Sequence, residues 1–204
     1  MAFTALDVKK LREMTNVGMM DCKKALQATD GDMDAAIDWL REKGLAKAAK
    51  KADRIAAEGV AYATVVDGVG VVIEVNAETD FAAKTDAFMD LVKNLATVVA
   101  TENPADVEAL KACKYPNSNL TVTEIMQEKV MSIGENMVIR RFDRFAENTN
   151  VAYVHAGGSH GVLVNLAVEG DIDVTEIGKN VAMQIAAMKA QYWSKDLVPQ
   201  EVVD

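Results

Sequence analysis

The sequence has 204 residues, of which 50% are apolar, and it carries a net charge of -9 at pH 7 with an isoelectric point near 4.8. Such an acidic chain is a poor candidate for nucleic acid as its main partner, because binding to phosphates depends on the density of Lys and Arg. No apolar run approaches the roughly 20 residues of a membrane helix. Residues 1–10 also lack the apolar segment of a signal peptide, so we expect a soluble, cytoplasmic protein without a membrane partner.

Residues 1–44 predict three short helices. The second covers residues 19–29, and the third begins after its cap, Asp32, and ends at Gly44. In each helix, apolar residues recur at the three- and four-residue spacing of one buried stripe. The pattern predicts a three-helix bundle similar to ubiquitin-associated domains.

Met20 does not follow the buried stripe of the second helix. At about 100° per residue it points away from Met19, Cys22 and Leu26, which share one face. A methionine in this place either packs against the third helix or lies at a binding surface, since methionine is common in both settings. The sequence leaves both interpretations open.

The charge balance changes after residue 54. Residues 1–54 carry eleven Lys and Arg against nine Asp and Glu, or +2; of the totals of 22 and 31, this leaves eleven against twenty-two, or -11, for the rest. The stretch 45–58 is rich in Ala and Lys, which predicts a basic helical connector with a solvated face.

The rest of the chain contains an internal repeat with an offset of 91 residues, in which Val-Ala-Tyr at 60–62 recurs at 151–153. In each copy a glycine turn separates two β-rich runs, and a helix follows, at 81–100 and at 174–190. A hairpin followed by a helix, twice, predicts an α+β fold with two related core subdomains and small antiparallel sheets.

Between the two copies we expect a helix over 124–133, which Gly134 ends, and a strand over 137–145. The predicted organisation therefore has three parts. They are a three-helix docking module with its basic connector (1–54), a first core subdomain (55–134) and a second core subdomain (135–204).

The junction before Phe81 is the most distinctive stretch. Residues 71–75 are mostly apolar and β-branched, which predicts a buried strand, and an acidic turn follows. The aromatic ring is either the first core residue of the next helix or an anchor for a partner. The second copy has Ile172 in place of Phe81 and Lys179 in place of Phe88, which is modest support for a role beyond packing.

The sequence shows no constellation typical of an enzyme. Its two histidines, His155 and His160, flank a turn, and neither a serine or cysteine nucleophile elbow nor carboxylate or thiol co-ligands are apparent nearby. It contains neither a G-x-x-x-x-G-K-[ST] nor a G-x-G-x-x-G loop, so we expect no direct nucleotide binding, no cofactor and no metal. Spacing alone does not exclude a hydrolase or a magnesium site built from the carboxylates Glu74, Glu78, Asp80 and Asp86.

Four motifs, in the same order along the chain, resemble bacterial elongation factor Ts: GMMDCKKAL at 18–26, AKAAKKA at 46–52, TDFAAKTDAF at 79–88 and SIGENMVIRRF at 132–142. The resemblance implies a translation elongation factor that acts as a guanine-nucleotide exchange factor and promotes GDP release from elongation factor Tu. The alternative is a protein-binding module without exchange activity.

The resemblance also implies where the partner is contacted. In that family the turn matching Thr79-Asp80-Phe81 inserts beside the magnesium and phosphate site of the partner, with the aromatic ring in an apolar pocket. Contacts that hold the two proteins in register are implied for Arg12, Met19, Met20, Ile133, Gly134 and His155.

Typical bacterial members continue past the point that matches Asp204 into a projecting helical hairpin and a last core-like segment. Neither is found in this sequence. We therefore expect a fragment or a short natural form, for which contacts or dimerisation through those segments are not implied.

Overall fold

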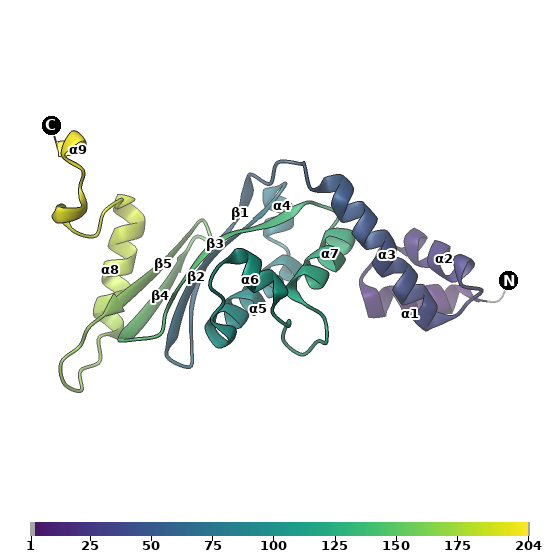
Figure 1. Ribbon diagram of the computed structural model, residues 1–204, viewed down its shortest axis with the longest axis horizontal. Helices are drawn as coiled ribbons and strands as arrows, with labels where there is room; N and C mark the ends of the chain where they lie inside the picture. Colours follow the sequence, from purple (N-terminus) through teal and green to yellow (C-terminus); the bar gives the residue numbers. More distant parts are fainter. Residues whose placement is uncertain (1–2, 204) are drawn as a thin grey trace.

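The computed structural model describes residues 3–203. The molecule is elongated, with the N-terminal helices at one end, antiparallel strands in the middle and α8 towards the other end (Figure 1). None of the helices in the described range is both long and apolar enough to cross a lipid bilayer. The elements are α1 (Ala5–Thr15), α2 (Met19–Ala28), α3 (Met33–Lys51), β1 (Glu58–Val66), β2 (Val69–Ala77), α4 (Asp80–Ala83), α5 (Asp86–Glu102), α6 (Val107–Ala112), α7 (Val122–Ile133), β3 (Met137–Phe145), β4 (Thr149–His155), β5 (His160–Leu166), α8 (Thr175–Met188), the 3-10 turn η1 (Lys195–Leu197) and α9 (Gln200–Val203).

Helices α1 to α3 form the predicted bundle around a core of their own. Leu11 of α1, Cys22 and Leu26 of α2 and Leu40 of α3 are all buried in it. Met20 is exposed, which decides between the two interpretations that the sequence left open. Met19 is also about half exposed, so its predicted placement on the buried face was wrong. Met19 is the first residue of α2 and therefore lies at the edge of the bundle core.

Gly44 does not end α3, which continues to Lys51. The glycine is buried inside the helix, where a Cβ would lie 3.4 Å from the sulfur of Met131 in α7. The glycine thus lies where α3 packs on α7, at a distance that would also admit a methyl group. The residues that follow include the strong helix formers Ala and Lys, with which the helix continues. The predicted separate connector is therefore the last turns of α3 followed by a short coil.

The strands confirm the α+β class with small antiparallel sheets. One sheet has the order β1-β2-β3, with Tyr62 opposite Ile73 and Ile73 opposite Phe142, and the other consists of β4 and β5. Strand β3 occupies the predicted range 137–145 and pairs with β2 of the first hairpin, although its residues fall in the range assigned to the second subdomain. The three-part division itself stays a prediction.

The largest core lies between the three-stranded sheet and α5. Phe88, Leu91 and Leu95 of α5 are fully buried and belong to one cluster with Val71 and Ile73 of β2. The single helix predicted over 81–100 is in fact two, because the Thr85 hydroxyl accepts the Phe88 N–H and starts α5 anew after the short α4.

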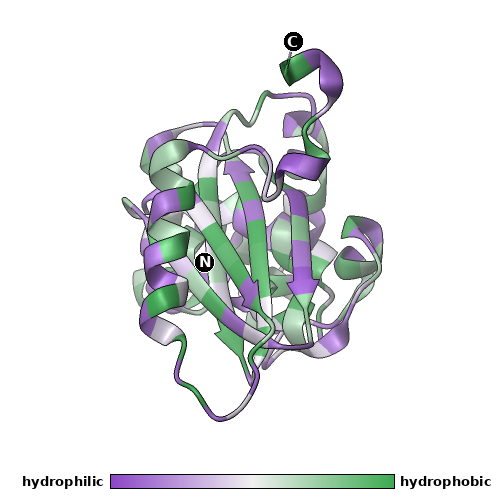
Figure 2. Ribbon diagram, turned by 90° about the vertical axis from the view of Figure 1, so that its left-hand side faces the viewer, coloured by the Kyte–Doolittle hydropathy of each residue, from purple (hydrophilic) through white to green (hydrophobic). Residues whose placement is uncertain are grey.

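Helix α8 lies within the predicted range 174–190 and packs on the two-stranded sheet. Gly178 makes this approach possible, since a Cβ there would lie 2.5 Å from a methyl carbon of Val151. The end view in Figure 2 shows apolar residues along the strands and mixed polarity along the helices that cover them. The hairpin-then-helix repeat is thus confirmed in both halves.

Candidate functional site

The turn at the end of β2 presents Phe81 to solvent. Thr79 caps α4: its hydroxyl accepts the N–H of Ala82 at 3.2 Å. Ala82 and Ala83 are buried against the core, so the opposite side of this one-turn helix faces outward and Phe81 is 81% exposed. Phe88, by contrast, is 0% exposed. Of the two alternatives left by the sequence, Phe81 is therefore not a core residue, and Phe88 is.

Asp80 lies next to Phe81 and is held in its ionised form. Its carboxylate accepts a hydrogen bond from the Lys84 ammonium group at 2.6 Å, one helical turn away. This hydrogen bond lowers the pKa of Asp80, and the carboxylate in turn raises the pKa of Lys84. The turn thus places a charged acid beside an exposed aromatic ring.

A second corner, formed by Ile133 and Gly134, lies beside this turn. Helix α7 ends at Ile133, and Gly134 takes the left-handed conformation with a φ of 91°, from which its N–H reaches the carbonyl of Val130 at 3.1 Å. Ile133 is half-buried and Gly134 is exposed. This corner is next to Glu135, which contacts Thr79. The structure therefore brings together two groups of predicted site residues, 79–81 and 133–134, that lie more than fifty residues apart in the chain.

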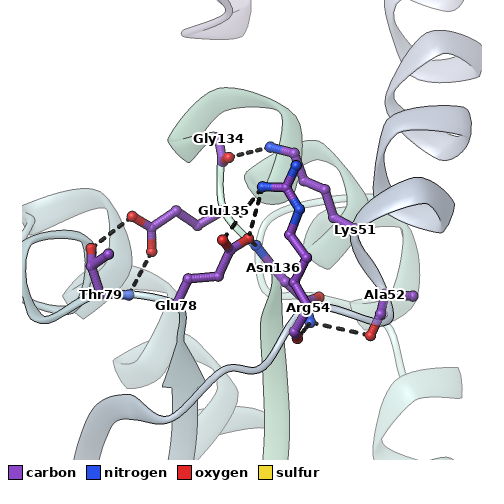
Figure 3. A network of polar contacts seen from close by, with 8 residues as sticks. All are labelled: Lys51, Ala52, Arg54, Glu78, Thr79, Gly134, Glu135 and Asn136. Carbon is purple, nitrogen blue, oxygen red and sulfur yellow. Dashed lines mark hydrogen bonds and ion pairs between the residues drawn. The ribbon is translucent and has the colours of Figure 1, made fainter.

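Glu135 and Glu78 join the two corners (Figure 3). The Glu135 carboxylate accepts the backbone N–H of Thr79 at 2.9 Å and its hydroxyl at 2.7 Å. The Glu78 carboxylate accepts the backbone N–H of Asn136 at 2.6 Å, which lowers the pKa of Glu78. Arg54 adds an ion pair to Glu78 at 3.4 Å.

The end of α3 is tied to the same place. The buried side-chain amide of Asn136 donates to the carbonyl oxygens of Arg54 at 2.8 Å and Ala52 at 3.3 Å, and the Lys51 ammonium group donates to the carbonyl of Gly134. Burial is the first cause of the lowered pKa of Lys51. Three chain segments therefore meet in one polar network that sequence reasoning missed, because its members lie far apart in the chain.

The other predicted contact residues lie away from this turn. Arg12, Met19 and Met20 are exposed on α1 and α2, in the bundle at the far end of α3 (Figure 1). Helix α3 connects the bundle to the region of the turn.

His155 ends β4 and is exposed, with its Nδ1 atom 2.8 Å from the Tyr153 hydroxyl. Its ring lies 6.1 Å from that of His160 across the turn to β5. A groove of about 910 Å³ has both Asp80 and His160 among its lining residues. The β4–β5 corner and the Asp80 turn thus border one hollow in the surface.

The acidic residues near the turn do not converge on a common point. Glu74 binds Arg141 at 2.8 Å, whereas Glu78 and Asp80 bind Asn136 and Lys84. Over residues 3–203, no group of three or more His, Cys, Asp or Glu side chains is arranged to hold a metal ion. What the site offers instead is a projecting aromatic side chain on a well-braced turn, which is a feature of protein-binding surfaces.

Comparison with known proteins matches residues 78–204 to the family described as Elongation factor TS. The whole chain is similar to the Elongation factor Ts of Magnetococcus marinus, with 45% identity over 207 residues, and to that of Syntrophotalea carbinolica, with 47% identity over 208 residues. It covers 68% and 69% of the length of these two relatives. The Elongation factor Ts of a Nostoc species is 48% identical over 96% of this chain and 66% of its own length.

Proposed function

The chain belongs to the elongation factor Ts family of translation elongation factors, and from this premise we propose that it is a guanine-nucleotide exchange factor that promotes GDP release from elongation factor Tu. In this proposal the chain binds no nucleotide itself and acts in the cytoplasm. It changes how fast another protein exchanges its ligand, and it catalyses no covalent reaction.

The observation that carries the proposal is the exposure of Phe81. A phenylalanine that is 81% exposed on a capped turn, while its neighbours Ala82 and Ala83 are buried, gains apolar burial only if another molecule covers it. Aromatic anchors that fill a pocket of the partner dominate the energy of many protein interfaces. Phe81 is proposed as such an anchor in elongation factor Tu.

Asp80 and Thr79 would act beside this anchor. With Phe81 inserted near the magnesium and phosphate site of the partner, the ionised Asp80 carboxylate would compete for the hydrogen bonds and water around the magnesium ion. The chain would thus bind the nucleotide-poor form of the partner more tightly than the GDP-bound form. Such a difference in affinity is what shifts the partner between its two states.

The remaining contacts would hold the two proteins in register. Ile133 and Gly134 flank the turn. His155 lies at the end of β4, beside the groove that the turn also borders, and Arg12, Met19 and Met20 lie farther away, on the helical bundle. A surface spread over three parts of an elongated molecule fits a large interface in which a few residues supply most of the affinity.

Release of fluorescent GDP from elongation factor Tu, with and without the chain, tests the proposal. An exchange factor accelerates release in proportion to its concentration until the partner is saturated. A chain that binds elongation factor Tu and leaves the release rate unchanged would be the alternative, a binding module without exchange activity.

A further inference from the structure

We propose that Glu135 is a positioning residue for the Phe81 turn, and that it holds α4 in the conformation that presents the aromatic ring. The inference rests on the proposed function for its consequence in binding. The effect of Glu135 on the turn is argued from the structure alone.

Helix α4 is too short to be stable alone. The helix has four residues, from Asp80 to Ala83, and a single turn of helix is not stable by its own hydrogen bonds. Its conformation must therefore come from contacts at its ends and on its buried side. On the buried side these are the small side chains of Ala82 and Ala83, which supply little area, so the N-terminal cap has a large share in fixing the turn.

The Thr79 hydroxyl takes part in two hydrogen bonds, one as acceptor and one as donor. It accepts the N–H of Ala82, which is the capping bond, and donates its own hydrogen to Glu135 at 2.7 Å. The backbone N–H of Thr79 donates to the other oxygen of the same carboxylate at 2.9 Å. Glu135 thus fixes both the backbone of Thr79 and the rotation of its hydroxyl, through two charge-assisted bonds.

The register of β2 with β3 leads directly to these contacts. The pairing of β2 with β3 ends with Ala77 opposite Met137. The next positions in this register would be 78 opposite 136 and 79 opposite 135, and these are the pairs that are joined, by side chains in place of the backbone ladder. Glu135 and Glu78 therefore continue the connection between the two chain segments for two residues beyond the sheet, up to Thr79, the N-cap of α4 (Figure 3).

These contacts preorganise the turn for binding, because they hold it in the observed conformation before the partner is met. If the chain must adopt the observed turn to insert Phe81, its apparent affinity is the intrinsic affinity reduced by the fraction of molecules in which the turn is formed. In Glu135→Gln the amide offers one acceptor and one donor in place of two acceptors, so one of the two Thr79 donors loses its partner. We expect a loss of about fivefold in affinity for nucleotide-free elongation factor Tu, by lowering that fraction.

The turn itself is tested first, on the free chain, by amide hydrogen exchange. The N–H groups of Ala82, Ala83 and Lys84 are bonded within the turn, and in Glu135→Gln we expect them to exchange about tenfold faster while core amides are unchanged. The matched control is Glu108→Gln, which removes the same charge from an exposed carboxylate paired with Lys111 on α6. Unchanged exchange at the turn would overturn the proposal, whatever the chain does to its partner.

A double-mutant cycle with Phe81→Ala then tests the link to binding. If Glu135 acts through the aromatic ring, Glu135→Gln weakens binding about fivefold in the natural background and has no further effect once Phe81 is removed. An equal loss in both backgrounds would contradict a positioning role and point to a direct contact of Glu135 or to general destabilisation. If the natural chain failed to accelerate GDP release, the proposed function would be refuted. The amide hydrogen-exchange result on the turn would still hold.

Discussion

Replacement of Phe81 by Ala is expected to weaken binding to elongation factor Tu strongly while leaving the fold intact. An aromatic side chain buries about 150–250 Å² when covered, so a ring that is 81% exposed has about 160 Å² to bury on a partner. At about 25 cal/mol per Å² this corresponds to an upper bound of about 4 kcal/mol. The ordering of the side chain costs about 0.5–1.5 kcal/mol, which leaves about 2.5–3.5 kcal/mol, or roughly a 60- to 300-fold rise in Kd.

Two controls separate binding from folding. Ile172 takes the place of Phe81 in the repeat and is also exposed, so Ile172→Ala removes an exposed apolar side chain and should leave the Kd unchanged. Phe88→Ala should lower the free energy of unfolding by about 3–5 kcal/mol, because that ring is fully buried. The free energy of unfolding of Phe81→Ala should stay within about 0.5 kcal/mol of the natural chain.

Calorimetric titration of nucleotide-free elongation factor Tu and urea unfolding of each variant supply the two quantities. The reasoning would be refuted if Phe81→Ala bound with normal affinity. It would also be refuted if the variant unfolded easily while exchange per folded molecule stayed normal, since the ring would then be part of the core.

Three further changes have defined outcomes. Asp80→Ala removes an exposed ion pair with Lys84, so the temperature of unfolding should barely change. The difference in affinity between GDP-bound and nucleotide-free partner should shrink more than the affinity for the nucleotide-free form does. An unchanged difference in affinity would count against a role for the carboxylate. Gly44→Ala should raise the free energy of unfolding in urea by about 0.5–1 kcal/mol, because Ala is the better helix former. Its Cβ would meet Met131 at an ordinary contact distance. A loss of stability would show that α3 and α7 lie too close together for the added methyl group. The folded-state pKa of Glu78 is lowered, so its contribution to stability is present above the ordinary glutamate pKa of about 4.3 and is lost as the pH falls further. Glu78→Gln should therefore lose less stability than the natural chain between pH 5 and pH 3, roughly the range of that titration. Equal losses in the two proteins would contradict this assignment.

Local sequence rules predicted the elements that depend on local chemistry. The turn of the first hairpin was predictable because Asp67 and Gly68 adopt positive φ, at 49° and 83°, which Asp and Gly tolerate. The end of α7 followed from Gly134 for the same reason. Gly44 misled the same rule, since a glycine can also lie inside a helix, and the packing of α3 on α7, which is not visible in the sequence, supports the helix beyond this residue.

The exposure of Phe81 could be suspected from the sequence, but the arrangement of the residues around it could not. The motif around Phe81 and the asymmetry of the repeat drew attention to the ring, yet a stretch as short as α4 contains too few residues for a periodic pattern to show which side is buried. The bonds of Glu135 to Thr79 span 56 positions of the chain. They follow from the register of β2 with β3, which a single sequence does not reveal.

The central claim is that the chain favours a nucleotide-poor state of elongation factor Tu, and its affinity for the two forms of that protein tests it most directly. By linkage, a chain that lowers the affinity of the partner for GDP must itself bind the GDP-loaded partner more weakly by the same factor. We expect calorimetry to show weaker binding to GDP-loaded than to nucleotide-free elongation factor Tu by a factor of roughly 5 to 150 or more. Equal affinities for the two forms would contradict the exchange mechanism and leave a protein that only binds its partner.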